Sequence, residues 1–181
     1  MFPLLETARL RLRALTTQDT ERIFQCFAHE EVIRYYGQER FQELQQAERL
    51  IELFAQSFAT EKGIRWGIEL KETAEIIGTI GFHNWLKAHK RAEIGYELHP
   101  DYWHKGYAQE ALTEVLAYGF QKMDLTRIGA VVFIENAASS QLLLKMGFQK
   151  EGILRAYMYQ HGQAHDTIIY ALLKTAYEGA N

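Results

Sequence analysis

The sequence predicts a mixed α/β fold, built on one sheet that contains both antiparallel and parallel strand pairs. Residues 64–100 hold three strand-like segments joined by short polar turns, which is typical of antiparallel neighbours. Residues 91–136 then run as strand, helix and strand, and a crossover of this kind makes parallel neighbours. The chain has 181 residues, 2 prolines and no Ser/Gly-rich linker, so we expect a single domain over residues 1–181.

The first half of the chain opens with a strand and two helices. Residues 8–15 (ARLRLRAL) alternate apolar side chains with arginine, which predicts a half-buried strand. Apolar stripes at helical spacing predict one helix over residues 16–29 and a second over residues 44–63. Residues 30–43 lack a regular period and contain Gly37, so we expect an irregular segment between the helices.

The second half alternates strands and helices. The expected elements are strands over 64–70, 75–85 and 91–100, a helix over 106–122, a strand over 125–136, a short helix over 137–148 closed by Gly147, and two strands within 150–174. The full order is therefore β-α-α-β-β-β-α-β-α-β-β.

Composition narrows the class of protein. The formal net charge of −3 gives no basic signature, so we expect no nucleic-acid partner. No apolar run is long enough to span a bilayer, and no basic stretch precedes the apolar residues at the N-terminus, so we expect no membrane partner. The single cysteine, Cys26, cannot form an internal disulfide and falls on an apolar helix face. We expect a soluble, cytoplasmic protein.

The segment HPDYWHKGYAQEAL, residues 99–112, joins a strand to a helix and is the first candidate binding site. The amides at a helix N-terminus receive phosphates, Gly106 allows close approach of an anion, and Ala108 is small enough to do the same. Lys105 offers a point charge. The alternative is a glycine-assisted turn that packs its own aromatic side chains.

Three motifs in this order carry a family resemblance. They are EIGYEL from Glu93, WHKGYAQEA from Trp103 and NAASSQLLLKMGF from Asn136. Together with the opening LETARLRLRALTTQD, the chain resembles the GCN5-related N-acetyltransferases (GNAT). Within them it resembles the branch of the RimJ/RimL-type ribosomal-protein N-terminal acetyltransferases. The resemblance implies the GNAT acyl-CoA N-acyltransferase fold and acetyl-CoA as co-substrate.

The resemblance also implies which residues hold acetyl-CoA. The pyrophosphate would lie on backbone amides of His104, Lys105, Gly106, Tyr107, Ala108 and Gln109. The pantetheine arm would lie beside Tyr96, Glu97 and Leu98, where two parallel strands splay apart, with hydrogen bonds from Asn136 and Ser139. Two positions depart from the wider family: Trp103 replaces a Gln or Arg, and Leu143 replaces a frequent general-acid tyrosine.

The expected chemistry is direct attack of an amine on the thioester carbonyl. Glu93 is the candidate general base, and a substrate-orienting carboxylate is the alternative for it. Ser139 is the candidate donor to the sulfur, and the alternative is a hydroxyl that bonds to backbone in the first turn of a helix. Backbone N–H groups near Leu98 can polarise the thioester oxygen.

Other polar residues receive simpler interpretations. His161 and His165 are four residues apart, but Gly162 places them on a turn, so we expect no metal. His83 is interpreted as a satisfied sheet histidine, with an acceptor-facing position as the alternative. Tyr35 and Tyr36, with Glu30, Glu31 and Glu39 nearby, fall in the segment that covers the acceptor site in the resembling family.

The sequence therefore predicts an acetyl-CoA-dependent N-acetyltransferase. The acceptor is a primary amine, and the resembling branch points to the N-terminal α-amine of a protein. The alternatives are a small-molecule amine such as a polyamine, antibiotic or amino acid, a CoA-binding sensor without catalysis, and a structural domain that binds no CoA. Members of the family often pair, so the resemblance leaves a homodimer open.

Overall fold

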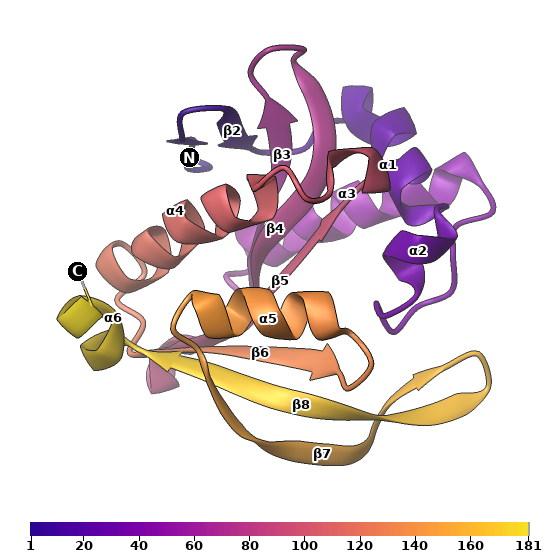
Figure 1. The fold of residues 1–181 in the computed structure, drawn as a ribbon. Coiled ribbons are helices and arrows are strands. Elements are labelled where there is room, and N and C mark those ends of the chain that lie inside the picture. The colour runs from indigo at the N-terminus through magenta and orange to yellow at the C-terminus, as the bar shows by residue number, and fades with distance from the viewer. Residues whose placement is uncertain (181) are drawn as a thin grey trace.

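A computed structural model describes residues 1–180 as one mixed sheet flanked by helices (Figure 1). The strands are β1 (Leu5–Glu6), β2 (Leu10–Arg13), β3 (Ile64–Leu70), β4 (Glu75–Leu86), β5 (Arg91–Leu98), β6 (Arg127–Phe133), β7 (Gln149–Gln160) and β8 (Gln163–Leu173). The helices are α1 (Thr20–Phe27), α2 (Glu30–Ile33), α3 (Leu44–Ala59), α4 (Tyr107–Gln121), α5 (Ala137–Lys145) and α6 (Lys174–Ala180).

The sheet has eight strands in the order β1-β2-β3-β4-β5-β6-β8-β7. The β5–β6 pair is parallel, and the other neighbouring strands described are antiparallel. This arrangement confirms the predicted mixed α/β class. The α4 crossover joins the two parallel strands, as the strand-helix-strand pattern requires.

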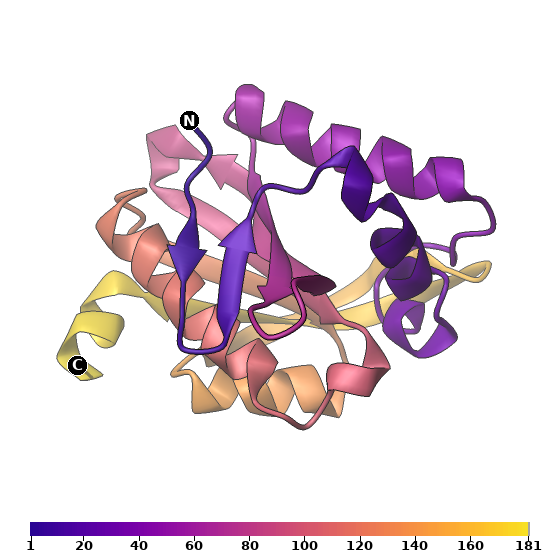
Figure 2. The same ribbon diagram turned by 90° about the horizontal axis from the view of Figure 1, so that it is seen from above.

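Helices cover both faces of the sheet (Figure 2). On one face, α1 and α3 enclose a core that includes Ile23, Phe27 and Ile51. On the other face, α4 packs apolar residues such as Leu112 and Leu116 against the larger core, as its predicted inner face requires. Burial of these apolar side chains stabilises the packing of the helices on both faces of the sheet. Each fully buried large apolar side chain contributes roughly 1.5–3 kcal/mol.

Three elements differ from the sequence prediction. Strand β1 is two residues long, too short to show an alternating pattern. Helix α2 forms within the segment expected to be irregular, because Glu30 and Glu31 occupy its first turn, where negative charge is favourable. Helix α6 follows β8 directly, with no turn residue to mark its start.

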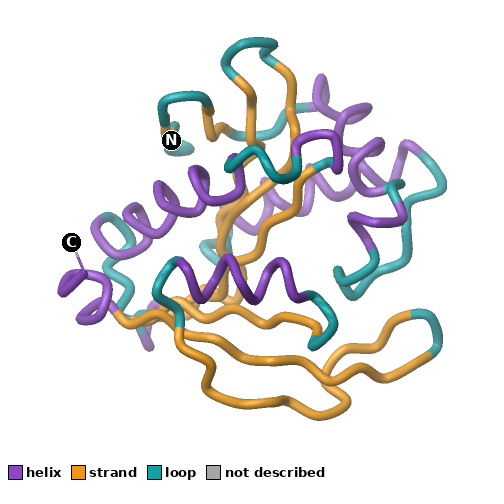
Figure 3. Tube along the Cα trace, in the orientation of Figure 1, coloured by secondary structure: helices purple, strands orange, loops and turns teal. Residues whose placement is uncertain are grey.

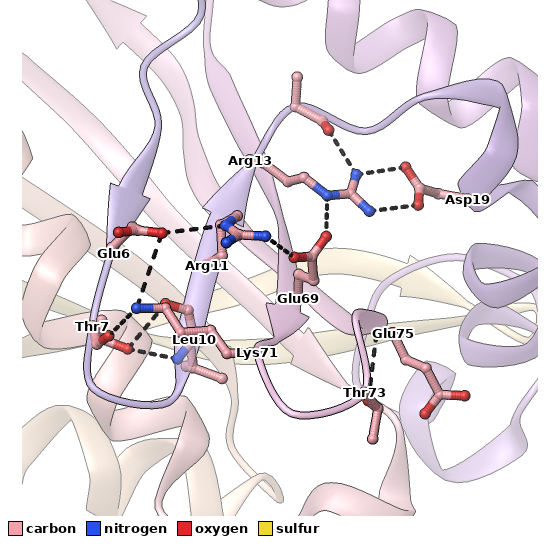
Figure 4. A network of polar contacts seen from close by, with 11 residues as sticks. Glu6, Thr7, Leu10, Arg11, Arg13, Asp19, Glu69, Lys71, Thr73 and Glu75 are labelled. Atoms are coloured by element: carbon pink, nitrogen blue, oxygen red, sulfur yellow. Dashed lines mark hydrogen bonds and ion pairs between the residues drawn. The ribbon is translucent and has the colours of Figure 1, made fainter.

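The arginines of β2 form a polar network at the sheet edge (Figure 4). Arg11 and Arg13 both contact Glu69, and the Arg13 guanidinium also binds the Asp19 carboxylate at 2.8 and 2.9 Å. Burial raises the pKa of Asp19, but hydrogen bonds from Arg13 and the Thr16 amide outweigh it and lower the pKa overall. The Arg13 side chain therefore ties β2 to the residue that precedes α1.

The β7–β8 hairpin extends past the rest of the sheet, and its tip lies beside the loop after α2 (Figure 3). The buried Gln160 amide makes the connection: Nε2 donates to the carbonyls of Ile33 and Gln38, at 2.9 and 2.8 Å. Its Oε1 accepts from the Gly37 amide at 3.2 Å. Segments more than 100 residues apart are thus held together. Within residues 1–180, no helix is long and apolar enough to cross a bilayer.

Candidate active site

Strands β5 and β6 begin as a pair and then separate. Their register runs from Arg91 opposite Arg127 to Glu93 opposite Gly129 and then ends. Both strands continue beyond this point, so residues 94–98 and 130–133 face each other without a ladder. Backbone groups along this edge of β5 are left for another partner. The splay predicted from the family resemblance is present.

A cavity of about 670 Å³ lies on the side of the splay where α4 begins. Nine of the residues predicted to hold acetyl-CoA line it: Tyr96, Glu97, Leu98, His104, Gly106, Ala108, Gln109, Asn136 and Ser139. We call this the donor cavity. Lys105 and Tyr107 do not line it: the Lys105 ammonium donates to the Asp101 carbonyl at 2.8 Å, and the Tyr107 ring lies beneath Arg9.

The loop before α4 is shaped to present its amides. Gly106 is the N-cap with φ +82°, a left-handed conformation that favours glycine, and His104 has φ +59°. The first intrahelical bond runs from the Glu110 amide to the Gly106 carbonyl, so the amides before Glu110 precede the hydrogen-bonded helix. The Trp103 indole donates to the Leu98 carbonyl at 2.8 Å and ties the loop to β5.

Arg9 supports the same loop and was not predicted from sequence. Its Nη1 donates to the Lys105 carbonyl at 3.0 Å, and its guanidinium lies 4.4 Å from the Tyr107 ring centroid. It also pairs with Glu110 in α4. Nothing in the sequence signals this contact, because Arg9 lies 96 residues before the loop.

Two hydroxyls meet at the splay. The Tyr96 Oη lies 2.9 Å from Ser139 Oγ, within hydrogen-bond distance. Ser139 is held there because the Asn136 side chain caps α5 and accepts from the Ser139 amide at 3.1 Å. Burial raises the pKa of Tyr96, so its hydroxyl keeps its proton. The sequence placed Tyr96 in the site, but the hydroxyl's partner lies 43 residues further along.

A second cavity, of about 530 Å³, lies on the α3 side of the splay. We call it the acceptor cavity. His83 and Glu93 line it, with His83 Nε2 at 3.4 Å from Glu93 Oε2 and the Asn84 amide donating to the same oxygen at 3.1 Å. The hydrogen bond with His83, followed by the one from Asn84, lowers the pKa of Glu93. The His83 side chain is 53% exposed and lines this cavity, so it is not enclosed within the sheet.

The two cavities meet at the splay. They share five lining residues: Tyr35, Tyr36, Tyr96, Asn136 and Ser139. The segment between α1 and α3 therefore covers both cavities through its two tyrosines. Of the acidic residues predicted nearby, Glu31 lines the donor cavity and Glu39 contacts His161 at 3.0 Å; Glu30 lines neither cavity.

Two remaining candidates take no part in the site. Cys26 is buried, and burial raises the pKa of its thiol, so it is unsuited to act as a nucleophile. No cluster of three or more His, Cys, Asp or Glu side chains in the described chain is arranged to hold a metal ion.

Comparison with known proteins identifies the family. A family model described as an acetyltransferase (GNAT) domain matches residues 9–149. The chain therefore belongs to the GNAT acetyltransferase family and is an N-acetyltransferase. It is 55% identical over 174 residues to the uncharacterized N-acetyltransferase YoaA of Bacillus subtilis (strain 168), covering 96% of this chain and 98% of the relative.

Two further comparisons bear on acceptors. The chain is 32% identical over 108 residues to the ribosomal protein uS5-alanine N-acetyltransferase of Escherichia coli (strain K12), covering 59% of this chain and 56% of the relative. It shares its fold with the spermidine N-acetyltransferase from Vibrio cholerae, solved in complex with CoA and spermine. That TM-score is 0.83 at 24% identity, over 95% of this chain and 99% of the other.

Proposed function

We propose that this protein transfers an acetyl group from acetyl-CoA directly to a primary amine, with CoA in the donor cavity and the amine in the acceptor cavity. The observation that carries the proposal is the meeting of the two cavities at the β5–β6 splay. A thioester placed there is open to an amine from the opposite side of the sheet. Such positioning supplies much of the rate enhancement in a two-substrate reaction.

The donor side holds CoA through backbone. The pyrophosphate lies against the amides around Gly106 at the start of α4, where helix partial charge and unpaired N–H groups favour an anion. The pantetheine arm pairs with the edge of β5 that β6 leaves open, where the Trp103 indole already occupies the Leu98 carbonyl. The Glu97 side chain is occupied by Arg65 and Thr79, and Glu97 lies opposite Thr79 in the β4–β5 ladder, so it lines the cavity without a free carboxylate oxygen for CoA.

The acceptor side removes the proton that an amine carries at neutral pH. Glu93 has a lowered pKa and is a weak base, which favours the positioning role over general base. Its carboxylate lies 3.4 Å from the His83 ring nitrogen and orients the ring, and an imidazole nitrogen is a common proton acceptor in catalysis. We assign proton removal to His83 and orientation of ring and ammonium to Glu93.

The departing thiolate receives a proton from the Tyr96–Ser139 pair. The neutral amine nitrogen bonds to the carbonyl carbon, the carbon–sulfur bond breaks, and the sulfur takes the hydroxyl proton. The nitrogen then gives up its second proton, which restores the hydroxyl and leaves a neutral amide. This pair replaces the tyrosine expected at position 143, where Leu143 is fully buried in the core. The presence of a hydroxyl donor favours an active enzyme over a silent CoA sensor.

For the acceptor, the similarity to the uS5-alanine enzyme supports a protein N-terminal α-amine. The shared fold with the spermidine enzyme keeps a small-molecule amine as the second candidate. Both acceptors require the same donor site and the same proton path.

Ala108→Glu tests the donor site. Ala108 lines the donor cavity in the first turn of α4, where a carboxylate suits the helix but repels a diphosphate. We expect wild-type protein to bind acetyl-CoA in a calorimetric titration, and the variant to bind it about tenfold or more weakly.

Gln45→Glu is the matched control. It adds the same charge to the first turn of α3, at an exposed position that lines neither cavity. The control is expected to bind like wild type. Absence of acetyl-CoA binding by wild type, or equal binding by Ala108→Glu, would contradict the proposal.

A further inference from the structure

The acceptor cavity is mostly aromatic and apolar, and its charges are few. Glu93 is the sole acidic residue among those that line it, and Lys62 and Arg65 are the basic ones, in the part of the chain that the structure describes. Tyr35, Phe54 and Tyr157 contribute aromatic walls. The charge state of each of the three ionic side chains therefore decides which amines fit.

Arg65 is already neutralised. Its guanidinium pairs with the Glu97 carboxylate, donates to Thr79 Oγ1 at 2.7 Å and to the Gly95 carbonyl at 3.0 Å. The side chain is 9% exposed. A buried cation with its donors committed in this way offers little to a ligand.

Lys62 is different, because it is exposed and forms no ion pair with any carboxylate of residues 1–180. It lies two residues before the start of β3, and its carbonyl accepts from the Trp85 amide of β4 at 3.1 Å. Glu93 lies in β5, opposite His83 on the other side of β4. Two strand spacings separate the backbones of Lys62 and Glu93, roughly 10 Å.

The lining thus includes a carboxylate at the reactive end and, two strands away, a lysine without an ion pair among the described carboxylates. We infer that the acceptor is an amine that carries an anionic group several ångströms from its nitrogen, and not a linear polyamine. The inference rests on the proposed function and names its substrate class. A polyamine would place a second ammonium beside Lys62 with no carboxylate to receive it, a repulsive contact that disfavours that ligand.

Three amines with the same six-carbon chain test the inference: 6-aminohexanoate, hexylamine and 1,6-diaminohexane end in an anion, a methyl group and a cation. We expect kcat/KM to fall in that order, by about tenfold or more between the extremes. Two peptides that begin Ala-Glu and Ala-Lys distinguish the source of the anion. Preference for Ala-Glu over the aminohexanoate indicates a protein N-terminus, and the reverse indicates a small molecule.

Lys62→Glu should reverse the preference between the anionic and cationic amines. Lys150→Glu is the control, since Lys150 is exposed on β7 and lines neither cavity, and it should keep the wild-type order. The inference would be overturned if wild type preferred 1,6-diaminohexane, or if Lys62→Glu left the order of preference among the amines unchanged. Either result would leave the proposed function intact. Transfer to none of the amines or peptides, with acetyl-CoA bound, would overturn it too but leave the donor site standing. The proposed function itself fails if acetyl-CoA does not bind.

Discussion

In the proposed mechanism, two residue pairs divide the proton transfers between them. His83 and Glu93 meet across β4 and β5 on the acceptor side, and Tyr96 and Ser139 meet at the splay. One pair offers a ring that takes up a proton and the other offers hydroxyls that give one. The reaction needs both, because an ammonium must lose its proton and a thiolate must gain one.

These two functions predict separate losses of activity. His83→Gln should lower kcat about 10-fold or more, since the proton acceptor is lost. The pKa of Glu93 is lowered, so its carboxylate stays charged and keeps its orienting function at neutral pH. Tyr96→Phe should lower kcat about 10-fold or more at every pH without changing the profile's shape, because the raised pKa of Tyr96 keeps its proton in place throughout.

Tyr118→Phe is the control for this pH series. Tyr118 also has a pKa raised by burial but lies in α4, and it lines neither cavity. It should behave as wild type. A His83→Gln variant with the kcat of wild type would contradict the assignment of His83.

Some residues of this site could be predicted from short sequence motifs. Glu93, Tyr96 and Gly106 lie in short motifs that a reader of the sequence can place on a strand end and a helix start. Arg9 and the Tyr96–Ser139 contact could not be predicted, because they depend on side chains brought together over 96 and 43 residues. The contact between His83 and Glu93 could not be predicted either, because the two residues meet across neighbouring strands.

At the scale of elements, the connection between the β7–β8 hairpin and the loop after α2 shapes the acceptor cavity. Gln160 holds that loop by three backbone hydrogen bonds, and the loop carries Tyr35 and Tyr36. Neither element has a strong local signal for this contact. The hairpin was predicted from its alternating pattern and turn, but the contact at its tip could not be.

Gln160→Glu tests the connection. The carboxylate has nearly the same shape but loses both donors and faces two carbonyls, so the loop should loosen. We expect the KM for the amine and the dissociation constant of acetyl-CoA both to rise severalfold, because Tyr35 and Tyr36 of this loop line both cavities. Steady-state kinetics and calorimetry measure the two quantities.

Gln149→Glu, at an exposed position near the other end of β7, is the control and should leave both quantities unchanged. A Gln160→Glu variant whose KM for the amine matches wild type would show that the connection does not shape acceptor binding.

Across the whole molecule, the order of the main helices and strands could be predicted from the sequence. The way in which they enclose the two cavities could not. Alternation, turn residues and the α4 crossover indicated a mixed sheet, and the structure confirms it. The short elements β1, α2 and α6 were missed because elements of 2, 4 and 7 residues carry too little pattern. The junction of two cavities at the splay depends on both sheet faces at once, which no local pattern encodes.

The central claim is direct transfer between two substrates that are bound together at this junction. Initial rates, measured while acetyl-CoA and the best amine of the six-carbon series are both varied, test it most directly. Double-reciprocal plots should intersect, because a ternary complex must form before the acetyl group moves and the buried Cys26 cannot carry it. Parallel plots, the pattern of an acetylated enzyme intermediate, would contradict the account.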